Sequence, residues 1–386
     1  MLDGPEFTER LADAPGGAPV LRALERHGRA RLVGGAVRDI LLGLQPREFD
    51  VVVSDDPHGF AELIGDVESE HERFGTLRTS VDGVRVDVAR ARTEVYAAPG
   101  ALPTVEFSDF EADLARRDFT INAISAGPDG DLQYAGGALD DLAARRTAVL
   151  HANSFIDDPT RLWRMVRYST RLGFEIADET ARLATEAIEG GALATVSSER
   201  HTAELRLLLD EVDVVPALTQ AASLGLIDDV DCRTSAVRDA AELALGRAHP
   251  GMAALGAAMQ GQGVLAAFSW TAVERAVLDA CTRAVPLPTV PPNTPSMVAA
   301  VARKLPAEAV AVAGARGSAA AAEHWFEQWA HVRPTITGDD LTRSGMAEGP
   351  AVGEALAALS AGLLDGQVTP GRDSELAWAL EHAGQA

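Results

Sequence analysis

The chain of 386 residues is long enough for about two to four domains. Its 47% hydrophobic and 24% charged residues are typical of a globular protein, and no uncharged apolar run of about 18 residues predicts a membrane span. The formal net charge of −23 speaks against binding nucleic acid through overall charge, although a basic surface could still gather locally.

The N-terminus and the cysteines indicate a compartment. Residues 1–15 are acidic and lack the apolar core of a signal peptide. Cys232 and Cys281 are too few for a disulfide framework or a zinc site, and their apolar helical surroundings favour buried thiols. We therefore expect a cytoplasmic protein without a membrane partner, and the sequence indicates no protein partner.

Residues 1–30 are predicted to form a helix, and a glycine pair follows it. Gly34-Gly35 stands after an apolar pair and before the helical run 36–44. Glycines at such a place let the backbone approach a phosphate, and Arg38 follows one helical turn later. Most glycine pairs are simple turns, so this pair gains weight only from its neighbours.

Two acidic residues, Glu48 and Asp50, open the apolar run 51–53. In a strand, residues i and i+2 point to the same face, so the two carboxylates converge. Convergent carboxylates suit Mg²⁺, which takes one or two of them together with substrate phosphates. A solvated strand end would explain the pair alone, but a phosphate loop and an arginine lie within about twenty residues, which favours the metal site.

A helix over 57–64 and a hairpin turn at Asp82-Gly83 come next. In the strand after the turn, valines 84, 86 and 88 alternate with Arg85 and Asp87. Asp87 is a possible third carboxylate of the metal site. A solvent-facing strand residue would fit the pattern equally well.

The segment 113–123, DLARRDFTINA, brings Arg116, Arg117 and Asp118 together. Ordinary surface salt bridges would explain any one of them. A nucleoside triphosphate, however, needs fixed cations for its phosphates and a carboxylate or amide for its ribose, and arginine has the planar fork that fits phosphate oxygens.

The segment 157–173, DDPTRLWRMVRYSTRLG, predicts a helix with Pro159 in its first turn. Its arginines recur every three or four residues and would form one stripe on the helix. A solvated basic stripe is the common reading of such a pattern. The stripe consists of Arg161, Arg164, Arg167 and Arg171.

Asp158 and Arg161 have a chemical reason to act together, because positions i and i+3 share a helix face. A carboxylate only accepts hydrogen bonds and a guanidinium only donates them. Cytosine and adenine both present an amino donor beside a ring-nitrogen acceptor, whereas uracil and guanine present the opposite pattern. The pair could therefore select C and A without a nucleic-acid template.

These motifs together resemble the class II tRNA nucleotidyltransferases and bacterial poly(A) polymerases, which have a polymerase-β-like head. The family usually has aspartate where this chain has Glu48, glutamate where it has Asp157, and an aspartate near Gln133, just before the hinge glycines. The resemblance rests on the runs LVGGAVRDILLG, EFD, RRDFTINA and DDPTR.

The resemblance implies an α+β fold with a nucleotidyltransferase head, a small mixed sheet with helices, followed by an all-α neck, body and tail. It implies a head over 1–150, a neck with the nucleotide-recognition helices over 151–213, a helical body over 214–290 and a helical RNA-binding tail over 291–386. By resemblance, Arg117 contacts the incoming nucleotide, Asp118 lies near its ribose, and Gly35, Arg38, Arg164 and Arg167 belong to the same site.

The second half is rich in alanine and helical in period, and a proline-rich segment, 286–295, could be a linker. Residues 198–205 resemble the family motif that braces the neck, so Glu199, Arg200 and Glu204 are expected to be structural and His201 to pack. Residues 336–341 and 349–353 resemble the family's tail, where helix starts can receive RNA phosphates. Glycines and prolines that only start or end helices would explain these segments as well.

The resemblance implies a tRNA nucleotidyltransferase that adds C, A or both from CTP and ATP to the tRNA 3′ end, with Glu48 and Asp50 holding two Mg²⁺ ions. One alternative is a poly(A) polymerase of the same fold. Another is a catalytically silent RNA-binding protein, suggested by Glu48 and Gln133. A small-molecule nucleotidyltransferase is a third.

Overall fold

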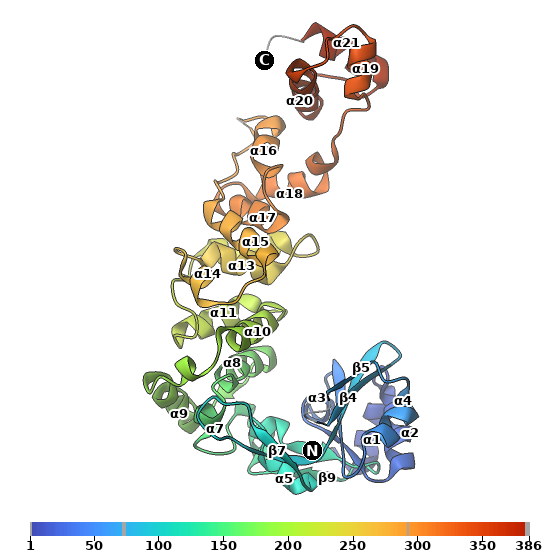
Figure 1. The fold of residues 1–386 in the computed structure, drawn as a ribbon, viewed down its shortest axis with the longest axis vertical. Coiled ribbons are helices and arrows are strands. Elements are labelled where there is room, and N and C mark those ends of the chain that lie inside the picture. Colours follow the sequence, from blue (N-terminus) through green and yellow to red (C-terminus); the bar gives the residue numbers. More distant parts are fainter. Residues whose placement is uncertain (1, 72–74, 292, 383–386) are drawn as a thin grey trace. The chain divides into compact units, whose positions relative to one another are not determined.

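The structure is a computed structural model that describes residues 2–71, 75–291 and 293–382 (Figure 1). It divides into two compact units, Met1–Glu204 and Leu205–Ala386. The finer division into head, neck, body and tail stays a prediction. Within the described ranges, no helix has the length and apolar character that crossing a membrane requires.

The N-terminal segment is two helices, so the prediction of one helix over 1–30 was wrong. Helix α1 (Gly4–Asp13) starts with a capping box between Asp3 and Glu6 and ends where Ala14 turns extended. Helix α2 (Gly17–His27) begins after Gly16, whose φ of 72° favours glycine. The apolar sides of both helices are buried at Phe7, Leu11, Val20 and Leu24.

A seven-stranded sheet forms the centre of the first unit in the order β3-β4-β5-β2-β1-β8-β9. Among the described strands of this sheet, only β2 and β5 pair in parallel, and their register sets Asp50 directly opposite Asp87. Strands β4 and β5 join at Asp82 and Gly83, whose positive φ angles confirm the predicted hairpin. The strands are β1 (Ala30–Val33), β2 (Glu48–Val53), β3 (Ser69–His71), β4 (Thr76–Val81), β5 (Val84–Arg90), β8 (Ile124–Ala126) and β9 (Leu132–Tyr134).

Short helices and two small two-stranded sheets complete this part of the first unit. Strands β6 (Arg92–Val95) and β7 (Thr104–Phe107) form a separate ribbon, and β10 (Arg146–Thr147) pairs in parallel with β11 (Glu175–Ile176). The helices are α3 (Gly35–Leu41), α4 (His58–Ile64), α5 (Phe110–Ala115), η2 (Thr120–Asn122) and α6 (Ala138–Ala143).

The predicted helix over 157–173 is divided in the structure. Helix α7 (Ser154–Asp157) ends at Asp158, and α8 (Arg161–Leu172) starts after Pro159 and Thr160. Asp158 is extended, with φ −136° and ψ 93°, because a residue before proline disfavours the helical region. The remaining elements here are α9 (Asp178–Glu189), η3 (Ala192–Thr195) and α10 (Ser198–Leu209).

The named elements of the second unit, within its described residues, are all helices. The proline-rich segment 286–295 connects α15 to α16 inside this unit, and α19, α20 and α21 share a small core that includes Leu341 and Leu359. The helices are α11 (Val214–Ser223), α12 (Ser235–Ala244), α13 (Pro250–Ala258), α14 (Gly263–Ala267), α15 (Ala272–Arg283), α16 (Pro295–Ala302), α17 (Ala307–Arg316), α18 (Ala319–Glu327), η4 (Trp329–His331), α19 (Gly338–Arg343), α20 (Pro350–Leu364) and α21 (Arg372–Glu381).

Candidate active site

A polar cleft of about 470 Å³ lies in the first unit. Its wall draws on the main sheet, the β6–β7 ribbon, η2 and α8, which are far apart in the sequence. Among the sequence-predicted site residues, it brings together Gly35, Asp50, Asp87, Arg117, Asp118, Asp158, Arg161 and Arg164. The other three, Glu48, Arg38 and Arg167, lie outside this lining.

The glycine pair forms one wall of the cleft at the junction of β1 and α3. Gly34 has a φ of 69°, a backbone conformation that favours glycine, and its N–H donates to the carbonyl of Ile124. A Cβ at Gly34 would also lie 2.7 Å from Nη1 of Arg117. The glycine therefore lets the β1–α3 turn and the Arg117 guanidinium lie against each other.

Asp50 and Asp87 bring two carboxylates together across the parallel strands β2 and β5. Burial, together with the nearby charge of Asp87, raises the pKa of Asp50 despite the opposing charge of Arg117. Asp87 accepts hydrogen bonds from Arg78 at 2.8 and 3.3 Å. Asp87 therefore lies beside Asp50, a position that the sequence gave only as one of two possibilities.

Glu48 lies two residues before Asp50 in β2 and forms an ion pair with Arg85. Its side chain is 42% exposed. Arg85 also approaches Asp87, with 3.4 Å between Nε and Oδ2. Arg85 thus lies between the carboxylates of Glu48 and Asp87 and supplies positive charge to the acidic face that these residues form with Asp50 on β2 and β5.

Arg38 lies outside the cleft lining and is only 2% exposed. Its Nη1 donates to Oδ1 of Asn122 at 2.5 Å, and its Nε and Nη2 donate to Asp39. These contacts hold α3 against η2. Arg38 therefore acts on the cleft through residues that line it, such as Asn122, and through the field of its charge.

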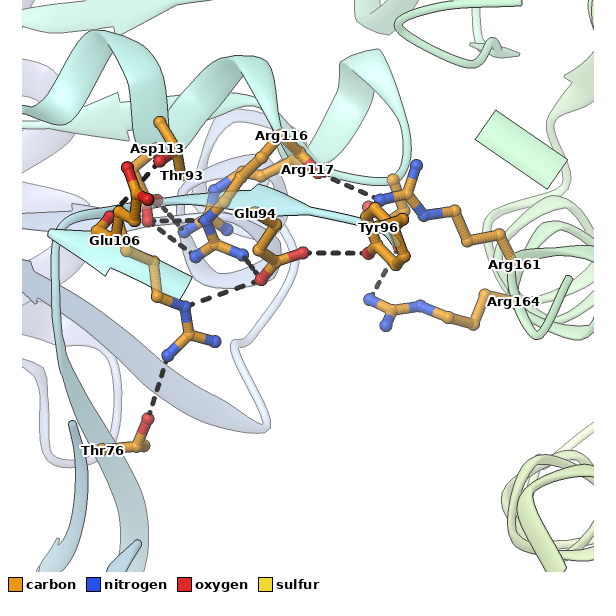
Figure 2. Close-up of polar contacts among 12 residues, drawn as sticks. Thr76, Thr93, Glu94, Tyr96, Glu106, Asp113, Arg116, Arg117, Arg161 and Arg164 are labelled. Carbon is orange, nitrogen blue, oxygen red and sulfur yellow. Dashed lines mark hydrogen bonds and ion pairs between the residues drawn. The ribbon is translucent and has the colours of Figure 1, made fainter. Parts of the chain in front are cut away.

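Asp113 anchors the two arginines of the DLARRDFTINA segment, as Figure 2 shows. Its carboxylate is 1% exposed and accepts from Arg116 at 2.6 Å and from Arg117 at 3.0 Å. Burial opposes ionisation of Asp113, but the two arginines outweigh burial and lower its pKa. Nε of Arg117 stays buried without a hydrogen-bond acceptor in the described protein, so a donor remains for an anionic ligand.

The β6–β7 ribbon reaches the same arginines through Glu94. Oε1 of Glu94 lies 2.7 Å from Nη1 of Arg116, and its Oε2 accepts from the hydroxyl of Tyr96 at 3.0 Å (Figure 2). Burial and the charge of Glu94 raise the pKa of Tyr96 to about 12, so the hydroxyl keeps its proton at neutral pH. At the edge of the cleft, Glu94 thus forms an ion pair with Arg116 and a hydrogen bond with Tyr96.

Asp118 is 5% exposed and lies 2.7 Å from Nη2 of Arg164. It also accepts from the side chain of Asn122 at 3.1 Å and from the backbone N–H of Phe119. Burial alone would raise the pKa of Asp118, but Arg164 and these hydrogen bonds outweigh burial and lower it. Nε of Arg164, like that of Arg117, is buried without an acceptor in the described protein.

Asp158 and Arg161 both line the cleft but do not share a helix face as predicted, because Asp158 lies outside α8. Oδ1 of Asp158 accepts from Thr160, through its N–H and its hydroxyl, and from Arg200 at 2.9 Å. Within the described residues, no donor contacts Oδ2. Arg161 is 4% exposed and donates to Ser154 and to the carbonyl of Arg116.

The arginine stripe of α8 is not the solvated surface that its spacing first suggests. Arg161 and Arg164 turn to the cleft, and Arg167 forms an ion pair with Glu204 at 2.9 Å. That pair joins α8 to α10. His201 accepts from the indole N–H of Trp163 and donates from Nε2 to the carbonyl of Leu193, as its predicted packing role requires.

Sequence reasoning missed three cleft residues that the fold supplies. Arg200 was expected to be structural, yet it lines the cleft and donates to Asp158 and to the carbonyl of Gly100 at 2.7 Å. Glu94 and Tyr168 were given no role from the sequence, although Tyr168 stands within the arginine-rich helix. Only the packing of α8, α10 and the β6–β7 ribbon reveals them.

The predicted RNA-binding helix starts of the second unit have different surroundings. At the start of α19, the carboxylate of Asp340 accepts from the N–H and the hydroxyl of Thr337 and pairs with Arg343 and Arg372. This carboxylate therefore caps the start of α19 and neutralises two nearby arginines. Helix α20 starts at Pro350 with no acidic residue in its first turn.

Comparison with known proteins finds relatives of the first part of the chain. Residues 30–147 match the family described as the poly A polymerase head domain. An A-adding tRNA nucleotidyltransferase from Geobacter sulfurreducens is 43% identical over 204 residues, which are 50% of this chain and 23% of that protein. One from Halalkalibacterium halodurans is 40% identical over 204 residues, 50% of this chain and 48% of that protein. The match thus spans half or less of these relatives' length.

The likeness to a solved structure extends along nearly the whole chain. A structure described as the apo form II of a CCA-adding enzyme has a TM-score of 0.79 at 26% identity, covering 98% of this chain and 96% of that chain. This agreement confirms the predicted α+β head followed by helices. Residues 30–147 therefore match the poly A polymerase head domain family, and the chain as a whole is similar in fold to a CCA-adding enzyme.

Proposed function

We propose that the protein is a tRNA nucleotidyltransferase that adds C, A or both to the 3′ end of tRNA from CTP and ATP. One observation carries the proposal: a single cleft holds two adjacent carboxylates, arginines with unused buried donors, and the Asp158–Arg161 pair. These groups are the ones that a metal ion, a triphosphate and a base each require.

In the proposed reaction, the 3′ hydroxyl oxygen of the tRNA attacks the α-phosphorus of the nucleoside triphosphate. The new bond joins that oxygen to the α-phosphorus, the bond from the α-phosphorus to the bridging oxygen breaks, and pyrophosphate leaves as the hydroxyl loses its proton. Arg117 and Arg164 hold the phosphates and the sugar with Asp118, and the glycine turn lets the substrate approach. Most of the catalysis is then positioning and charge stabilisation.

The acidic face of β2 and β5 fits Mg²⁺, since Asp50 and Asp87 lie side by side and no described side chain donates to Asp50. Glu48 can join them if its ion pair with Arg85 opens. When bound, two Mg²⁺ ions would lower the pKa of the attacking hydroxyl and stabilise the leaving oxygens. The phosphates would supply the further oxygen ligands.

The contacts of Asp158 support template-free base selection. Three donors fix Oδ1, which leaves Oδ2 to accept from the amino group of cytosine or adenine. Arg161 is held by Ser154 and the Arg116 carbonyl and keeps further N–H groups for the ring nitrogen. Uracil and guanine would leave these buried groups unpaired, at about 1–3 kcal/mol each.

Addition of A has specific support, because the two curated relatives described above are both A-adding enzymes. A poly(A) polymerase of the same family is the second candidate, favoured by the description of the matching head domain. A catalytically weakened RNA-binding homologue is the third, because Glu48 is longer than the usual aspartate and is ion-paired.

The test uses the full chain with Mg²⁺ and three tRNA substrates that end before the first C, after the two Cs, and after the complete CCA. Labelled CTP, ATP, UTP and GTP are supplied one at a time. Extension of only the CC-ended tRNA by a single A identifies an A-adding enzyme, and a long A tail on any RNA identifies a poly(A) polymerase. Binding of tRNA without any incorporation, with Mg²⁺ or Mn²⁺, would reject the transferase proposal.

A further inference from the structure

Tyr168 lies among cations in a part of the cleft that the proposed reaction leaves without a role. It belongs to α8 and lines the cleft. The guanidinium carbons of four arginines lie 5.5–5.9 Å from the centroid of its ring, within the range of cation–π attraction. They are Arg38 from α3 and Arg164, Arg167 and Arg171 from α8.

A second aromatic ring packs against Tyr168. Phe119 packs edge-on against Tyr168, with 5.8 Å between the ring centroids and 87° between the ring planes. Phe119 is fully buried, so it is a rigid support for Tyr168. The electron-rich face of Tyr168 therefore offsets the mutual repulsion of the surrounding guanidinium groups at a defined position.

Among these four arginines, Arg164 alone lines the cleft, and Tyr168 contacts it twice. The ring attracts its guanidinium, and the hydroxyl accepts a hydrogen bond from its Nη2 at 3.3 Å. The same Nη2 lies 2.7 Å from Oδ2 of Asp118. Tyr168 and Asp118 thus hold one nitrogen of Arg164 between them, while its Nε remains buried without an acceptor in the described protein.

Arg38 connects the same ring to the glycine turn. Its Nη1 donates to Asn122, and Asn122 donates to Oδ1 of Asp118. The contacts therefore run from α3 through η2 to Asp118, on to Arg164, and return to Arg38 through the ring of Tyr168. A closed set of contacts resists displacement of any one member better than an open chain does.

We propose that Tyr168 is a positioning residue for the incoming nucleotide, because its ring and hydroxyl hold Arg164 in the orientation that serves the cleft. The inference rests on the proposed function, in which this cleft binds a nucleoside triphosphate. The ring contributes more than the hydroxyl, since the ring meets all four cations and the hydroxyl meets only Arg164.

The test compares Tyr168→Phe, Tyr168→Met and Tyr168→Leu in the full chain. The matched control is Tyr134→Leu, which changes a tyrosine that is 51% exposed in β9. Dissociation constants for ATP and CTP are measured by calorimetry without tRNA, and KM and kcat are measured with tRNA. Tyr168→Met should raise the dissociation constant and KM about tenfold and change kcat less, because a flexible thioether keeps volume but loses the π face.

Tyr168→Phe should stay within about threefold of the wild type, since it keeps the ring. A merely space-filling tyrosine would give Tyr168→Met the same nucleotide affinity as the wild type, and that result would overturn the inference. If Tyr168→Leu does not fold by circular dichroism, Tyr168→Met and Tyr168→Phe still decide the outcome.

A double substitution separates positioning from general damage. If Tyr168 acts through Arg164, then Tyr168→Met should add little to the loss of nucleotide affinity caused by Arg164→Gln. Full additivity of the two losses would reject the inference. A wild-type protein that binds neither ATP nor CTP would instead reject the proposed function, so the two failures are distinguishable.

Discussion

The arginine pairs of the cleft differ from the exposed arginine pairs of the second unit in what surrounds the acidic partner. In the first unit, Asp113 and Asp118 are 1% and 5% exposed where they meet the arginines of the cleft. In the second unit, Arg247 and Arg283 pair with Glu327 and Asp279, which are 58% and 38% exposed. A buried ion pair holds its arginine in one orientation, and the donors that the pair does not use remain available to a ligand. An exposed ion pair is screened by solvent and contributes little to stability.

This difference resolves the apparent conflict between the net charge and the proposed substrate. A charge of −23 describes the whole chain, but the cleft receives Arg117, Arg161 and Arg164 from two distant segments. Local field and donor geometry decide whether a triphosphate binds. The comparison predicts that changes in the cleft alter catalysis strongly and that changes to the exposed pairs alter only stability.

Asp50→Asn should have the largest effect. Loss of one carboxylate from the proposed metal site should lower kcat by about a thousandfold or more, since charge stabilisation is the main catalytic contribution expected here. Single-nucleotide incorporation into tRNA measures this loss. Incorporation within tenfold of the wild type would remove Asp50 from its assigned role.

The same substitution should stabilise the protein at neutral pH in the absence of Mg²⁺. Burial raises the pKa of Asp50 in the folded state, so folding favours the protonated form, and that contribution is lost as pH rises through the folded pKa. Asparagine removes the cost of the buried charge at neutral pH, and the gain should disappear below the unfolded pKa of about 3.8. Denaturant unfolding measures this gain in unfolding free energy, and Asp82→Asn in the exposed β4–β5 turn is the control.

Asp158→Ala should come second, with about a hundredfold loss of kcat/KM for the accepted nucleotide. The variant removes the proposed acceptor for the base amino group and leaves Arg200 without its carboxylate partner. Affinity for tRNA should stay nearly unchanged, which gel-shift titration can check. An unaltered preference among the four nucleotides would contradict the base-reading role of Asp158.

Arg200 shows what sequence reasoning could and could not predict at this site. The acidic residues of β2, the glycine turn and the arginines of the cleft were predicted from short motifs. This was possible because the residues of each motif lie close together in the sequence. Arg200 is 42 residues from Asp158, and its contact depends on how α10 packs beside α8. The helix face shared by Asp158 and Arg161 was predicted wrongly, because Pro159 keeps Asp158 extended.

Glu48→Asp should have a small effect, with activity preserved or raised by a few fold. Aspartate is one methylene shorter, and Mg²⁺ prefers near-ideal octahedral geometry, so the shorter side chain suits a metal site at this position. The shorter side chain should also weaken the ion pair with Arg85 that now engages Glu48. Initial rates across a range of Mg²⁺ concentrations measure both effects. Complete loss of activity would show that the glutamate has a role other than metal binding.

Arg206→Gln should have the smallest effect and should sharpen the contrast between the units. Arg206 contacts Glu274 twice, at 2.6 and 2.8 Å, and these hydrogen bonds lower the pKa of Glu274 to about 2. Because the pair is partly exposed, its loss should cost less than about 1 kcal/mol of unfolding free energy at pH 7.

The pH dependence of that loss follows from the direction of the shift. A carboxyl whose folded pKa is lowered stabilises the fold above its unfolded pKa, here 4.5, and this contribution is lost as pH falls toward about 2. The difference in unfolding free energy between the wild type and Arg206→Gln should therefore shrink over that range and also at high salt. Nucleotide affinity should not change at any pH tested, because Arg206 and Glu274 belong to the second unit and the cleft to the first. A loss of nucleotide affinity in this variant would mean that the exposed pairs are not confined to stability, and the distinction between the two units would fail.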